Sequence, residues 1–296
     1  MPHRDITRTC LPRSLVTGNV SNMNSRILVT LGPASLSEEI VSKCSELGIY
    51  VFRVNLSHTP IDSVEETIQK IQSWTDVPVC LDSEGAQLRN QYMDGGEVFF
   101  DEGDKVHIHF DSLIGNKENI SFMPIGISRE FKTGSHITID FNGAEFLIER
   151  AQKNKCTAVV TKAGIVGSNK AANIDQTLSF EPITEKDFCA IKIGLDNNVS
   201  HFALSFANNE NDVDKMREAC GKNATIICKI ESRDGVKNLD NIVSRADEIL
   251  IDRGDLSREV ELQKIPLLQR HIIAKANEAK KPVYVATNLL ETMTAN

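Results

Sequence analysis

A lysine and a glutamate stand two positions apart where an apolar segment ends, in "ATIICKIESRDG" (residues 224–235). On a β-strand, side chains at positions i and i+2 lie on the same face, so Lys229 and Glu231 should point the same way. The pair could be a structural ion pair at a strand end, or a cation and a carboxylate held together for chemistry. The residues that follow the other predicted strands bear on this choice.

Polar or flexible residues also come where other apolar segments end. They are Arg53, Asn55, Ser57, Asp82, Ser83, Ser205, Arg253, Gly254, Asp255 and Thr287. A structural ion pair or a turn explains any one of them. A convergent set at one edge of a sheet points instead to a functional site.

The residue types indicate which chemistry such a site could perform. Glu231 and Asp255 are hard oxygen donors suited to a divalent ion, Mg²⁺ or Mn²⁺. Lys229 and Arg53 carry the positive charge that stabilises a phosphoryl group in transfer. Gly254 lets the backbone approach an anion, and its amide can donate to a carboxylate where a helix begins.

A second group offers neutral oxygens and one charge, a combination that suits a monovalent cation. Its members are Asn55, Ser57, Asp82 and Ser83. Turn and capping hydrogen bonds are the alternative explanation for these residue types.

Short apolar runs alternate with amphipathic segments along most of the chain, which is typical of βα units. The predicted strands are 26–31, 50–54, 77–82, 201–206, 224–231, 248–252 and 282–287. The predicted helices are 35–48, 62–74, 183–197, 209–220 and 264–279, with the start of another at 288–296. The pattern predicts an α/β fold, a (β/α)8-type TIM barrel one strand short, whose chemistry lies at the carboxyl ends of its strands.

The alternation of strand and helix patterns is interrupted between the third and fourth predicted strands. Residues 91–181 contain Gly-rich turns and alternating segments such as "DKVHIHF" and "CTAVVTKAG", which predict an inserted small β-barrel lid domain. The incomplete barrel domain is then 26–90 together with 182–296. Residues 1–25 are polar and arginine-containing, and we expect a disordered lead, with a transit peptide as the alternative.

Composition excludes several classes of partner. The chain has 296 residues, 41% hydrophobic and 25% charged, and its net charge is −8, so broad binding to nucleic acid or an anionic membrane is not expected. No apolar run is long enough for a membrane span. Seven scattered cysteines without a C-x-x-C motif indicate a reducing compartment, and we expect a cytoplasmic protein.

At these residues the sequence resembles the pyruvate kinase family. The segments that carry the resemblance are "ILVTLGPAS", "FRVNLSH", "LDSEGAQLR", "GSNKAANI", "ITEKD", "FALSF", "CKIESRDGVKNLDNI", "DRGDLSREVELQKIPLLQ" and "KPVYVATNLLETM". They follow in the family's order and approximate spacing from about residue 26 to the end. The resemblance implies a barrel with a lid domain and the last step of glycolysis, in which phosphoenolpyruvate and ADP give pyruvate and ATP.

The resemblance also implies roles for individual residues. Lys229 would stabilise the moving phosphoryl group, Glu231 and Asp255 would bind Mg²⁺, and Thr287 would take part in protonating the enolate. Arg53 and Ser205 match phosphate contacts, and the Gly254 and Asp255 amides match contacts to the substrate carboxylate. Asn55, Ser57, Asp82 and Ser83 match potassium ligands. Positions near the nucleotide are matched by Pro33, His58, Arg89 and Lys170.

Several positions depart from the family's pattern. Glu84 stands where the family has lysine, Asn208 where it has arginine, and Asp252 where it has alanine, beside the proposed metal pair. In the lid, Asp140-Phe141-Asn142-Gly143 replaces Ile-Asp-Asp-Gly.

The chain also ends before the family's eighth strand and its C-terminal domain. We expect two open strand edges, where a second copy or a partner chain could pair. Two alternative functions stay open. One is a metal-dependent enzyme, a lyase or decarboxylase, that acts on phosphoenolpyruvate or a related oxo acid without a nucleotide. The other is a non-catalytic regulatory or scaffold protein.

Overall fold

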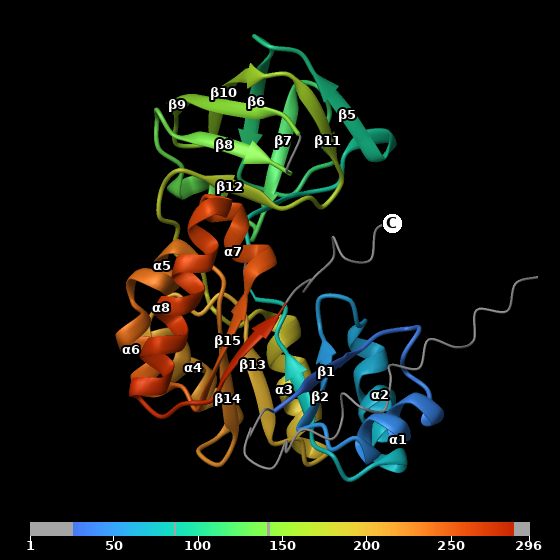
Figure 1. Cartoon of the computed structure of the whole chain (residues 1–296). Helices are drawn as coiled ribbons and strands as arrows, with labels where there is room; N and C mark the ends of the chain where they lie inside the picture. Colours follow the sequence, from blue (N-terminus) through green and yellow to red (C-terminus); the bar gives the residue numbers. More distant parts are fainter. Residues whose placement is uncertain (1–25, 86, 141–142, 287–296) are drawn as a thin grey trace, which may run out of the picture.

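The computed structural model describes residues 26–85, 87–140 and 143–286. Seven parallel strands form one sheet in the order β1-β2-β3-β13-β14-β15-β16. Their bounds are β1 (Leu28–Leu31), β2 (Val51–Asn55), β3 (Val79–Asp82), β13 (His201–Leu204), β14 (Thr225–Ile230), β15 (Glu248–Asp252) and β16 (Val283–Ala286). This nearly closed parallel barrel with helices outside it confirms the predicted α/β class (Figure 1). Residues 1–25 and the predicted helix at 288–296 lie outside the described residues.

Side-chain alternation divides each strand between the interior of the barrel and the helical layer. One buried residue from each of six strands packs into an interior cluster: Val51, Cys80, Ala203, Ile227, Leu250 and Tyr284. Their neighbours in sequence, such as Phe52, Leu81 and Ile249, pack outward in a larger core with the helices. Because the strand period is two, the next interior position along each strand falls at its carboxyl end. Arg53, Asp82, Ser205, Lys229 and Asp252 occupy these positions.

Eight α-helices are present among the described residues. They are α1 (Glu38–Glu46), α2 (Ile61–Trp74), α3 (Glu185–Asp196), α4 (Glu210–Cys220), α5 (Arg233–Lys237), α6 (Leu239–Arg245), α7 (Arg253–Glu259) and α8 (Ile265–Glu278). Capping boxes begin α3, at Thr184, and α4, at Asn209. The sequence prediction missed α5, α6 and α7. Ser232 and Asp252 cap the first and last of these, so capping residues were the available signal.

The inserted segment folds over residues 89–174 into two small sheets, which we call the lid. The larger sheet has the order β12-β8-β9-β10-β6-β7-β4, and β11 pairs with β5. Their bounds are β4 (Arg89–Asn90), β5 (Glu97–Phe100), β6 (Lys105–His109), β7 (Asn119–Met123), β8 (His136–Ile139), β9 (Glu145–Ala151), β10 (Lys155–Lys162), β11 (Gly164–Gly167) and β12 (Ala172–Ile174). The lid has its own apolar core and lies beyond the barrel, on the side of α7 (Figure 1). The domain boundaries proposed from sequence stay a prediction.

A polar cluster closes the amino end of the barrel. The buried Glu248 carboxylate accepts hydrogen bonds from Tyr50 at 3.0 Å, from Tyr284 at 2.9 Å and from Arg26 at 2.8 Å. Arg26 precedes the edge strand β1, whereas Tyr284 lies on the other edge strand, β16. The cluster therefore connects the two edges, between which the described residues contain no strand pairing.

No helix within the described ranges combines the length and the apolar character needed to cross a membrane.

Candidate active site

Lys229 lies at the centre of the barrel's carboxyl end. The residue is 6% exposed, and its ammonium lies 3.0 Å from Glu231 Oε1. Asp82 Oδ1, at the end of β3, is 3.3 Å away, and Ser205 Oγ, after β13, is 3.0 Å away. The structure thus brings together side chains from the ends of three neighbouring strands.

Burial and charge act on this cluster in opposite directions. Burial lowers the pKa of Lys229, but Asp82 and Glu231 outweigh it and leave the pKa above its ordinary value, so the ammonium stays charged. Burial raises the pKa of Glu231 to about 7. The nearby Asp255 and Asp252 also raise this pKa, whereas Lys229 lowers it. The negative charge of Glu231 is therefore disfavoured in this position, and a further cation would stabilise it.

Arg53 supplies the second positive charge. Its Nη1 lies 3.5 Å from Asp82 Oδ2, and its Nε donates to Thr30 Oγ1 at 2.9 Å. Asp82 is fully buried between Arg53 and Lys229. It therefore holds two cations at one edge, where they could share an anionic ligand.

The loop after β3 fits tightly against the end of β13. Ser205 N donates to Ser83 Oγ at 2.9 Å, and Ser205 Oγ donates to Ser83 O at 2.6 Å. Gly85 has φ of +70°, and a Cβ there would lie 2.8 Å from Ser205 Cβ, so this approach requires glycine. The contacts orient the Ser205 hydroxyl toward Lys229.

Phe206 adopts a left-handed conformation next to this contact, with φ of 51°. Such a backbone costs about 1–3 kcal/mol in a residue other than glycine and persists where the surroundings hold it. Its amide donates to Glu231 Oε2 at 2.8 Å. The unusual backbone therefore fixes one oxygen of the buried glutamate. The sequence carries no signal for it.

Three carboxylates meet beside Lys229 where β14 and β15 end. One oxygen each from Glu231, Asp252 and Asp255 lies within 4.8 Å of the others. Glu231 Oε1 is ion-paired with the Lys229 ammonium at 3.0 Å, and within the described residues it has no other polar partner. A buried oxygen of this kind, in a group of hard donors, fits a divalent ion such as Mg²⁺ or Mn²⁺.

Three further predicted site residues, Gly254, Asp255 and Thr287, follow strands β15 and β16 in the sequence. Gly254 N donates to Asp252 Oδ1 at 3.1 Å, so the chain's own carboxylate already uses this amide. Asp255 lies 3.5 Å from Arg258 Nη1, and burial, followed by Asp252, raises the pKa of Asp255. Thr287 lies outside the described residues.

The proposed monovalent-cation group lies on the ends of β2 and β3. Asn55 and Asp82 are register partners there, and Asn55 Oδ1 accepts from Ser57 N at 2.9 Å. Ser83 Oγ accepts from Ser205 N. Two of the four side chains thus make turn or loop hydrogen bonds, and the monovalent cation stays a prediction.

Glu84, the acid that replaces a family lysine near this group, is paired. It lies 3.3 Å from Lys186, whose ammonium also donates to Leu56 O at 2.5 Å. Asn208, where the family has arginine, instead accepts from Ser232 Oγ and holds Asn238 through its backbone oxygen at 2.7 Å. Both departures have local structural partners.

The four predicted nucleotide residues fall into two pairs. Arg89 and Lys170 lie on adjoining segments of the lid, since Arg89 forms an isolated bridge with Ala171. Pro33 and His58 lie at exposed positions of the barrel. No hydrogen bond or ion pair among the described residues joins one pair to the other.

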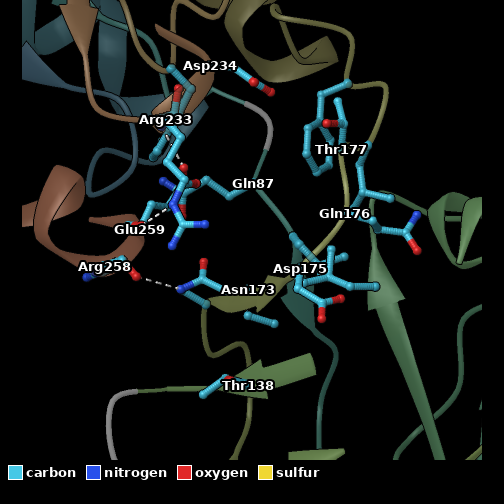
Figure 2. Close-up of a pocket in the computed structure, with 18 of the residues that line it drawn as sticks. Gln87, Thr138, Asn173, Asp175, Gln176, Thr177, Arg233, Asp234, Arg258 and Glu259 are labelled. Atoms are coloured by element: carbon cyan, nitrogen blue, oxygen red, sulfur yellow. Dashed lines mark hydrogen bonds between the residues drawn. The ribbon is translucent and has the colours of Figure 1, made fainter. Parts of the chain in front are cut away.

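A cavity of about 510 Å³ separates the lid from the barrel. Figure 2 shows Gln87 and Arg233 facing it, with Asn173 of β12 donating to Arg258 O at 3.2 Å. Asp255 also lines it, so the cavity adjoins the three carboxylates. A ligand there would touch both parts of the molecule.

Comparisons with known proteins agree with this architecture. A family model described as "Pyruvate kinase, barrel domain" matches residues 22–296. The chain is 32% identical over 279 residues to the pyruvate kinase of Thermococcus litoralis, covering 91% of this chain and 59% of that protein. It is 31% identical over 284 residues to the pyruvate kinase of Thermotoga maritima, covering 92% of this chain and 60% of that protein. It is 29% identical over 293 residues to plastidial pyruvate kinase 3 of Arabidopsis thaliana, covering 96% of this chain and 51% of that protein. The chain spans about half to three-fifths of the length of these relatives.

Proposed function

This chain belongs to the pyruvate kinase family, and we propose that it transfers a phosphoryl group from phosphoenolpyruvate to ADP, giving pyruvate and ATP. One observation carries the proposal. The Lys229 ammonium, 3.0 Å from Glu231, lies where the strands of the barrel end, next to a group of carboxylates that could hold a divalent ion. Phosphoryl transfer needs this juxtaposition of fixed positive charge and metal-binding oxygens.

Lys229 and Arg53 would bind the oxygens of the transferred phosphoryl group. Both are anchored to Asp82, so the positions of their charges are set before substrate arrives. Ser205 Oγ, 3.0 Å from the Lys229 ammonium, would contact the same group. Such alignment supplies much of the rate enhancement in phosphoryl transfer, which needs little covalent catalysis by the protein.

Glu231 and Asp255 would hold Mg²⁺ or Mn²⁺, which when bound neutralises charge on the substrate and product oxygens. The Asp255 amide is a proposed donor to the substrate carboxylate, whereas the Gly254 amide would first have to release Asp252. Thr287 is the proposed participant in protonating the enolate.

The remaining roles are also proposals. Asn55, Ser57, Asp82 and Ser83 would bind K⁺, and Pro33, His58, Arg89 and Lys170 would contact the nucleotide across the lid and the barrel. A second copy or a partner chain could pair with the edge of β1 or β16.

One paired assay tests the proposed function against its alternatives. ATP formation from phosphoenolpyruvate and ADP is measured with Mg²⁺, with and without K⁺, alongside exchange of pyruvate methyl protons in D₂O. ATP formation together with exchange supports the proposal. Exchange without ATP formation would replace it with a nucleotide-independent oxo-acid enzyme. Absence of both would indicate a regulatory or scaffold protein.

A further inference from the structure

The carboxyl end of α7 is held by two different parts of the molecule. The last four carbonyl groups of a helix have no partner within it, so they accept hydrogen bonds from other segments. Arg233, at the start of α5, donates from Nε to Glu259 O, and its amide donates to Glu259 Oε2 at 2.9 Å. Asn173 of β12 donates from Nδ2 to Arg258 O at 3.2 Å (Figure 2). One anchor of α7 therefore lies in the barrel and the other in the lid.

The lid segment around Asn173 also carries the proposed nucleotide residues. Lys170 lies three positions before Asn173, and its amide donates to Asn90 Oδ1 at 2.8 Å. Arg89, next to Asn90 in the chain, donates from Nη1 to Asn169 O at 3.1 Å. These contacts join Arg89 and Lys170 to the segment that ends in Asn173. The place where Asn173 is anchored therefore determines where both cations lie.

The other end of α7 carries groups proposed to bind the substrate and the metal. Gly254 and Asp255 belong to its first turn, and Asp255 lines the same cavity as Asn173. The bond from Asn173 to Arg258 O thus connects the nucleotide residues of the lid with the helix that borders the transfer site. Their separation matters, because transfer between two bound substrates requires that both be aligned.

We propose that Asn173 is a positioning residue for the nucleoside diphosphate. Through its hydrogen bond to Arg258 O, it holds the lid where Arg89 and Lys170 reach the nucleotide. The inference rests on the proposed function and extends it to a residue that acts through others. When this bond is lost, the lid shifts rather than α7, since α7 keeps its contacts with Arg233.

Equilibrium binding of ADP with Mg²⁺ to the full chain tests this inference without turnover. Isothermal titration gives the Kd in the absence of phosphoenolpyruvate. Asn173→Ala removes the donor, and because Asn173 is exposed the packing of the lid stays intact. Thr138→Val is the matched control, since Thr138 is the register partner of Asn173 on β8 and lines the same cavity. Circular dichroism checks that both variants fold.

We expect Asn173→Ala to raise both the Kd and the KM for ADP about 3–10-fold, the contribution of one hydrogen bond. Its KM for phosphoenolpyruvate should stay unchanged, which a general loosening of the fold would not achieve. Thr138→Val should bind ADP like the wild type.

Three results would overturn the inference while ATP formation by the wild type upholds the proposed function. Asn173→Ala could bind ADP like the wild type, its KM for phosphoenolpyruvate could rise as much as that for ADP, or Thr138→Val could weaken ADP binding equally. Absence of ADP binding by the wild type would instead refute the inference and the proposed function together.

Discussion

Replacing Lys229 by methionine separates phosphoryl transfer from enolate chemistry. Methionine has a similar length but no charge, so the variant removes the cation that faces Asp82 at 3.3 Å and Glu231 at 3.0 Å. Removal of a single preorganised donor to a transition-state oxygen costs about 2.7–4 kcal/mol, or about 10²–10³ in kcat. We therefore expect ATP formation to fall at least about 100-fold. Exchange of pyruvate protons, which needs no cation on a phosphoryl group, should stay measurable.

The same change also has a structural cost. At an effective dielectric constant of about 20, contacts at 3.0 and 3.3 Å each represent an attraction of about 5 kcal/mol, most of which offsets desolvation. Breaking a buried ion pair by removing one partner costs about 3–5 kcal/mol of folding stability. Urea denaturation should show a loss of this size, because Asp82 and Glu231 lose a shared cation.

A second substitution distinguishes the catalytic loss from the structural one. Adding Glu231→Gln to Lys229→Met removes the buried carboxylate that has lost its near cation and should recover part of the stability, while ATP formation stays low. Lys215→Met, which removes an exposed lysine paired with Glu181, is the matched control and should change neither quantity. ATP formation by Lys229→Met within tenfold of the wild type would refute the role assigned to Lys229.

Three further predictions concern the surroundings of the site. Gly85→Ala should destabilise the fold by about 1–3 kcal/mol more than Gly48→Ala in urea denaturation, because overpacking adds to the backbone strain. Both glycines have positive φ, but only Gly85 would bring a Cβ to 2.8 Å from Ser205 Cβ; equal losses would contradict this. Burial lowers the pKa of His201, so the unfolded chain binds the proton more readily, and stability should fall as pH drops through about 6.5. The stability of His201→Gln relative to the wild type should therefore rise on going from pH 7.5 to 5.5, and a constant difference would argue against that origin. Arg53→Lys keeps the charge but loses the planar guanidinium, and should raise KM for phosphoenolpyruvate about tenfold in the ATP assay. An unchanged KM would show that Arg53 does not touch the substrate.

The barrel and much of its site could be predicted because side chains along a strand alternate between two faces, so every second residue faces the barrel interior. Once "TIICKI" is a strand with Ile227 inside, Lys229 must face the same interior, and the same logic places Arg53 and Asp82. The short helices α5 to α7 were not predicted because each has only five to seven residues and lacks a long apolar periodicity. Lid strands such as β5 and β12 are three or four residues long, and their partners are distant in sequence.

The features missed at the site depend on backbone conformation rather than on residue type. Nothing in "LSFAN" indicates that Phe206 takes a positive φ and turns its amide toward Glu231. The sequence showed Asp252 as an extra acid, but only the folded backbone places one of its oxygens within 4.8 Å of oxygens of Glu231 and Asp255.

A crystal structure of the chain with Mn²⁺ and phosphoenolpyruvate tests the central claim most directly. The anomalous signal of Mn²⁺ should lie in contact with Glu231 and Asp255, and the phosphoryl group should contact the Lys229 ammonium. A metal bound elsewhere, or a phosphoryl group out of reach of Lys229 at saturating ligand, would contradict the account.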